Sequence, residues 1–107
     1  MTENEKIIMM QKMTTALPVM RKSLHISQGE LSEMTGLGRS TISALETGKL
    51  EMTWSTFVPL LTIFRVNPES RKLFEPYEIN IEQLNDFWII QNRNSKKKMM
   101  REVDKDE

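Results

Sequence analysis

The sequence predicts an all-α fold, and two observations carry that prediction. Apolar residues recur at the three- and four-residue spacing of helices in several separate segments. Sustained apolar–polar alternation is missing, as is the Asn-Gly dipeptide that often closes a β-hairpin. The length of 107 residues favours one domain with modest extensions.

The first predicted helix follows Thr2, which can cap it. Glu3 and Glu5 suit the first turn because helix N-termini attract negative charge. Pro18 interrupts the pattern, and we predict a kinked, nearly continuous helix in preference to a new helix capped by Thr15. The predicted apolar stripe consists of Ile7, Met10, Met13 or Thr14, Leu17, Met20 and Leu24.

The segment ISQGELSEMTGLGRSTISALETGK, residues 26–49, predicts two short helices around a glycine turn. Ser27 and Glu30 match a capping box, in which each side chain bonds the backbone N–H of the other residue. This helix is expected to end at about Thr35, where Gly36 suits a left-handed conformation.

The second helix of this pair is predicted from Arg39 to about Glu46. Its outward face offers short polar groups and one guanidinium, which suit close approach to base edges, since Arg can bind guanine bidentately. These groups are Arg39, Ser40, Thr41 and Ser43, with the small Ala44 on the exposed or groove-facing side. The residues spaced to hold the pair against a core are Leu31, Met34, Leu37, Ile42 and Leu45.

Three more helices are predicted towards the C-terminus. Thr53 can cap a helix through Phe64, Pro68 begins one to about Phe74, and Asn80 caps one over roughly 81–96. The apolar run Phe87, Trp88, Ile89 and Ile90 cannot face one side of a helix, so part of it is free to pack on a partner. The basic run that follows is either a solvated tail or a phosphate contact, and comprises Arg93, Lys96, Lys97, Lys98 and Arg101.

Composition narrows the class of protein. The 15 basic and 15 acidic residues give zero formal net charge, which counts mildly against a DNA binder, although a neutral protein can carry one basic face. There is no cysteine and a single histidine, His25, so no metal ion, cofactor or catalytic role is expected. The longest apolar stretch, near Val58–Phe64, is too short to span a bilayer, and we expect a cytoplasmic protein.

The joint pattern resembles a known family. The stretch LPVMRKSLHISQGELSEMTGLGRSTISALETGK has a basic residue in its first helix, a Ser-Gln helix start, a glycine turn, Arg-Ser-Thr-Ile-Ser and a closing Glu-x-Gly-Lys. This is similar to the Cro/repressor-like, or XRE-family, helix-turn-helix regulators over about residues 17–74. The resemblance implies a lambda-repressor-like helix-turn-helix DNA-binding domain at 17–75. An N-terminal helical extension at 1–16, a C-terminal helix at 76–98 and a charged, disordered tail at 99–107 would surround it.

The resemblance also implies a DNA interface. Base contacts fall on Arg39, Ser40, Ser43 and Ala44, and backbone contacts on Gln28, Thr41, Thr47 and Lys49. Gln28 would also brace Arg39, and Arg21 with Glu46 would form a buried structural ion pair. Two residues depart from the family pattern: Gly38 replaces the usual Ser or Thr cap, and His25 stands where glycine is common.

The predicted function is a sequence-specific transcriptional regulator that binds double-stranded DNA as a homodimer on a near-palindromic operator. It would be bacterial or phage-encoded and act by repression or activation. The dimer surface would be the Pro68–Phe74 helix or the Phe87–Ile90 segment. One alternative is an antitoxin-like regulator whose C-terminal helix binds a protein partner; another is an interaction module that has lost DNA binding.

Overall fold

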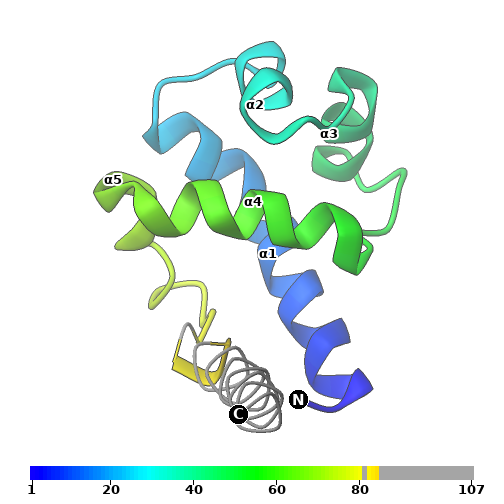
Figure 1. Ribbon diagram of the computed structural model, residues 1–107, viewed down its shortest axis with the longest axis vertical. Coiled ribbons are helices and arrows are strands. Elements are labelled where there is room, and N and C mark those ends of the chain that lie inside the picture. The colour runs from blue at the N-terminus through cyan, green and yellow to red at the C-terminus, as the bar shows by residue number, and fades with distance from the viewer. Residues whose placement is uncertain (81, 85–107) are drawn as a thin grey trace, which may run out of the picture.

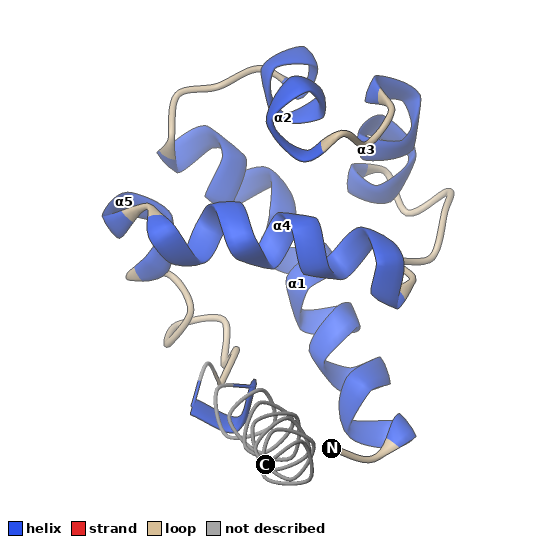
Figure 2. Cartoon of the chain, viewed as in Figure 1, coloured by secondary structure: helices blue, strands red, loops and turns tan. Residues whose placement is uncertain are grey.

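The computed structural model of the chain describes residues 1–80 and 82–84, and these contain helices and loops but no strand (Figures 1 and 2). The all-α prediction is confirmed. The predicted segment Phe87–Ile90 and the basic run lie outside the described residues, as does most of the predicted helix 81–96. The helices are α1 (Glu3–Ser23), α2 (Gln28–Thr35), α3 (Arg39–Glu46), α4 (Trp54–Val66) and α5 (Pro68–Arg71).

Helix α4 crosses the middle part of α1, and α2 and α3 lie on one side of this crossing (Figure 1). The first turns of α1 project on the other side, towards the segment that follows α5 (Figure 1). Two hydrogen bonds tie them to that segment: Lys12 Nζ donates to the Glu78 carbonyl at 3.0 Å, and Gln83 Nε2 donates to Glu5 Oε2. The N-terminal turns of α1 therefore pack on the end of the described chain, away from α2 and α3.

Helix α1 runs for 21 residues without a break. Thr2 caps it, because its hydroxyl accepts the Glu5 N–H at 3.1 Å, as the sequence predicts. Pro18 lies inside the helix, and the nearly continuous helix is confirmed.

The buried face of α1 differs from prediction in its first turns. Ile7 is 45% exposed and Met10 is only half-buried, whereas Met9 is 4% exposed. Glu5 and Lys12 lie three or four residues from Met9, on the same side of the helix. Both contact the segment after α5, so that segment covers the Met9 side and leaves Ile7 out. The buried residues of α1 are Met9, Met13, Ala16, Leu17 and Met20.

One apolar core joins helices α1 to α4. Leu31 of α2 and Ile42 and Leu45 of α3 are fully buried, as predicted, and Leu37 is partly buried against them. Met34 is 47% exposed, so its predicted place in the core is wrong. The centre of the core is made by the fully buried Met13, Leu17, Met20, Phe57, Leu60 and Phe64.

Helix α5 is shorter than predicted, because it ends at Arg71 and not near Phe74. The Leu73 N–H bonds to the Ser70 carbonyl and the Phe74 N–H to the Arg71 carbonyl, so the chain tightens into turns with three-residue spacing. These turns place Phe74 in the core at 2% exposure. Nearby, the buried Ser70 hydroxyl donates to the Phe64 carbonyl at 2.7 Å, which fixes α5 on α4.

Candidate nucleic-acid interface

A tight turn sets α3 at an angle to α2. Helix α2 begins with the predicted capping box: Ser27 Oγ accepts the Glu30 N–H at 3.0 Å, and Glu30 Oε1 accepts the Ser27 N–H at 3.1 Å. It ends at Gly36, which adopts φ 77°, the left-handed conformation that glycine takes without steric cost. The Ser32 hydroxyl donates to the Leu37 carbonyl at 2.5 Å, and this bond holds the turn to α2.

Gly38 is the N-cap of α3 and supplies no side-chain hydrogen bond. Its φ of −65° is ordinary for any residue, so glycine is not needed there for its backbone freedom. His25, the other departure from the family pattern, does adopt a left-handed backbone, with φ 56° in the turn between α1 and α2. The left-handed bend is therefore made with histidine in place of glycine, at some conformational cost.

Helix α3 has one buried side and one outward side. Ile42 and Leu45 are fully buried against the core. At 100° per residue, Ser40, Ser43 and Ala44 lie on the opposite side of the helix, and Arg39 lies at the edge of that side. Arg39 and Ser40 are exposed there, and Ser43 and Ala44 are half-buried. The structure thus brings these four together on one face.

The predicted backbone-contacting residues are more scattered. Thr41 is half-buried and lies towards the Leu45 side of α3, so its predicted place on the outward face is wrong. Thr47 and Lys49 are exposed just beyond the helix end, on either side of Gly48 with φ 76°. The Thr47 hydroxyl donates back to the Ser43 carbonyl at 3.0 Å, so a phosphate contact through it requires that bond to be given up.

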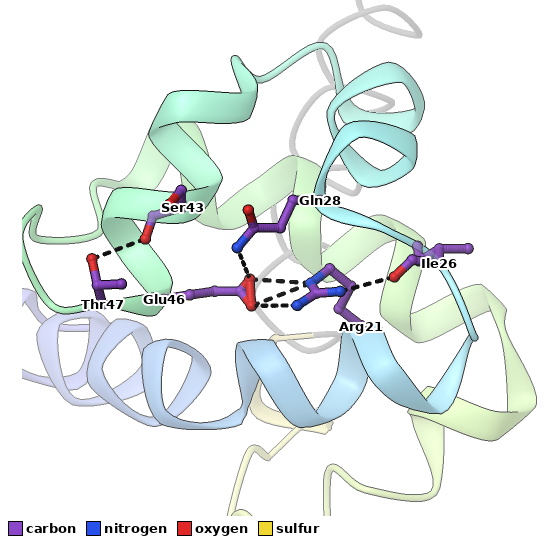
Figure 3. A network of polar contacts seen from close by, with 6 residues as sticks. All are labelled: Arg21, Ile26, Gln28, Ser43, Glu46 and Thr47. Carbon is purple, nitrogen blue, oxygen red and sulfur yellow. Dashed lines mark hydrogen bonds and ion pairs between the residues drawn. The ribbon is translucent and has the colours of Figure 1, made fainter.

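The predicted ion pair between Arg21 and Glu46 is present at the end of α3 (Figure 3). Arg21 Nη2 is 2.9 Å from Glu46 Oε1, and Arg21 Nε donates to both carboxylate oxygens at 3.1 and 3.2 Å. The side chains are 14% and 7% exposed, respectively. Arg21 Nη1 also donates to the Ile26 carbonyl at 2.9 Å, so one guanidinium ties α1 both to the end of α3 and to the turn before α2.

Gln28 belongs to this network, which differs from the expected bracing of Arg39. Its Nε2 donates to Glu46 Oε2 at 3.1 Å (Figure 3). Sequence reasoning missed this contact, because no local pattern relates residues 18 positions apart, and it also missed the bond from Arg21 to the Ile26 carbonyl. Gln28 is half-buried at the first residue of α2.

The described part of the chain was also searched for metal sites and membrane-spanning helices. Residues 1–80 and 82–84 contain no group of three or more metal-ligating side chains, and none of their helices is long and apolar enough to cross a membrane. Far from α3 in the sequence, a hydrogen bond from Lys72, together with its charge, lowers the pKa of the exposed Glu69 on α5.

The fold and the outward face of α3 define a class of protein: a helix-turn-helix DNA-binding protein, in which the second helix of the pair enters the major groove. Residues 20–69 match the family model HTH_3, described as Helix-turn-helix. This segment is therefore a helix-turn-helix domain of the Cro/C1 type, or XRE family, a DNA-binding and non-enzymatic family, and the predicted resemblance is confirmed. Comparisons with curated proteins and with solved structures gave no significant match.

Proposed function

We propose that the chain is a sequence-specific transcriptional regulator that binds double-stranded DNA as a homodimer on a near-palindromic operator. The family match supports DNA binding, and the outward face of α3 supports sequence recognition. Two copies of α3 would enter successive major grooves roughly 34 Å apart. Binding at a promoter would act sterically, in the cytoplasm of a bacterium or of a phage-infected cell.

Arg39 carries the sequence-specific part of the proposal. It is the exposed first residue of α3 and lies at the edge of the outward face. A long guanidinium at that place can reach guanine O6 and N7, the commonest specific contact in the major groove. Ser40, Ser43 and Ala44 are short enough to let the helix lie close to the bases. Gln28, Thr41, Thr47 and Lys49 would hold the DNA backbone.

Selection from a randomised duplex pool tests this function. The wild type should enrich an inverted repeat, and Arg39→Ala should lose or relax one base position in each half-site, at a cost of about 1–3 kcal/mol. Arg65→Ala is a matched control, because Arg65 is also an exposed helical arginine but lies in the last turn of α4. It should enrich the wild-type site.

The selection also separates the proposal from its alternatives. Sites without inverted symmetry would contradict binding as a homodimer. A lack of binding even at low salt would contradict DNA recognition altogether, because non-specific attraction to phosphate is strongest there. That result would favour a protein-interaction module.

A further inference from the structure

Glu46 joins the ends of three helices through one carboxylate. Arg21 comes from the last turn of α1, Gln28 is the first residue of α2, and Glu46 is the last residue of α3. The carboxylate is 7% exposed and accepts from both partners. Arg21 accounts for the neutralisation of its charge. Gln28 brings no charge, so its bond to Glu46 has a different consequence.

The bond fixes which part of the Gln28 amide faces inward. A carboxylate can only accept, so the contacting atom must be the amide nitrogen. Figure 3 shows the amide oxygen pointing away from Glu46. A DNA phosphate also only accepts, so it can use only the second hydrogen on the same nitrogen. A phosphate bound by Gln28 would thus share a nitrogen with the internal bond.

The two oxygens of Glu46 are held differently. Oε1 accepts only from Arg21, through Nε and Nη2, whereas Oε2 accepts from Arg21 Nε and from Gln28 Nε2. Gln28 is therefore the one contact in this network that connects the start of α2 directly to the end of α3. Three of the four side chains proposed to meet the DNA backbone lie at these two helix ends: Gln28 itself, Thr47 and Lys49.

We propose that Gln28 is a positioning residue: through Glu46 it sets the orientation of α3 relative to α2, and so the fit of α3 to base edges. This inference rests on the proposed function. It adds a role to the phosphate contact that the family resemblance implies, because the internal bond exists without DNA.

Three possible roles of Gln28 predict different binding behaviour. A contact to phosphate alone contributes equally on every sequence, because phosphates carry no sequence information. A role in folding alone lowers the folded fraction and leaves the ratio of specific to non-specific affinity unchanged. A positioning role lowers specific affinity more than non-specific affinity, because only base contacts depend on the orientation of α3.

The experiment compares Gln28→Met with the wild type on two duplexes. One carries the site that the wild type enriches from a randomised pool, and the other is a scrambled duplex of equal length and composition. Methionine keeps the length of the side chain and removes its donor. Gln11→Met is the matched control, since Gln11 is an exposed glutamine on α1 that is not part of the network. Gln28→Ala is a second variant in case methionine perturbs folding, which circular dichroism would show.

The ratio of affinities for the selected and scrambled duplexes should fall about tenfold in Gln28→Met, the loss expected for one hydrogen bond to a charged group. Affinity for the scrambled duplex should fall less than affinity for the selected duplex, because loss of a phosphate contact lowers both equally and only the selected duplex also loses base contacts. Equal losses on both duplexes, or no loss on either, would overturn the positioning role and leave the proposed function standing. A wild type that enriches no site would overturn the proposed function, and this inference with it.

Discussion

Arg21→Met should destabilise the domain strongly, because it leaves a nearly buried carboxylate without its cation. The change removes three hydrogen bonds from Arg21 to Glu46 and one to the Ile26 carbonyl. Glu46, at 7% exposure, would retain only the neutral Gln28 as a partner. Breaking a buried ion pair in this way typically costs about 3–5 kcal/mol, a large share of the roughly 5–15 kcal/mol that stabilises a small domain.

Urea unfolding monitored by circular dichroism measures this loss. For a urea m-value near 2 kcal/mol/M, a loss of about 4 kcal/mol moves the midpoint down by about 2 M. The double variant Arg21→Met/Glu46→Leu should recover most of the stability, because a well-packed apolar pair can replace a buried ion pair.

Lys72→Met is the matched control for burial. Lys72 Nζ lies 2.7 Å from Glu69 Oε2, closer than the Arg21–Glu46 contact, but both side chains are more than 60% exposed. Its loss should leave the midpoint unchanged, because solvent screens exposed pairs. If Arg21→Met shifted the midpoint no more than Lys72→Met does, the argument that burial makes the Arg21–Glu46 pair important would be refuted.

Two further predictions concern glycines around α3. Gly38→Ser should raise stability by about 0.3 kcal/mol, or about 2 °C in Tm, because serine adds an oxygen that can cap α3. The backbone accepts the change, since its φ is −65° and an added Cβ meets nothing closer than 3.5 Å. A lower Tm would contradict the argument that α3 lacks a side-chain cap. Gly36→Ala should lower stability by about 1–2 kcal/mol because of the left-handed backbone at φ 77°. The matched Gly29→Ala, inside α2 with ordinary φ and an added Cβ at 3.7 Å from Ser27 Oγ, should not lower it, and equal losses would contradict the backbone argument.

The helix ends marked by capping residues were predictable because those signals are local. Thr2, the Ser27–Glu30 capping box and Gly36 each act within four residues of the chain, and all three are found as predicted. The absence of strands from residues 1–80 and 82–84 was equally predictable, because the sequence lacks the alternating pattern typical of strands.

The choice between neighbouring apolar positions was not predictable. From Leu31, helical spacing allows both position 34 and position 35 to face inward. In the structure Thr35 is half-buried, with its hydroxyl bonded to the Leu31 carbonyl, and Met34 is exposed. Which side is covered depends on how α2 packs on α3 and α4, information that one helix does not contain.

Part of the candidate DNA interface was also predictable from the sequence, and part was not. The sequence pattern located α3, and the structure places Arg39, Ser40, Ser43 and Ala44 on its outward face. The partner of Gln28 depended on where the far end of α3 comes to lie, which follows from the tertiary arrangement of three helices.

The most direct test of the central claim, that α3 is the DNA-contacting helix, is to map backbone amide chemical shifts by NMR while duplex DNA is added at low salt. The account predicts that perturbations concentrate at residues 39–49 and at Gln28, and that they weaken as salt is raised. Arg71 at the end of α5 and Lys72 directly after it provide an internal comparison, as exposed basic residues outside this surface. Perturbations centred on α5, or none at low salt, would contradict the account.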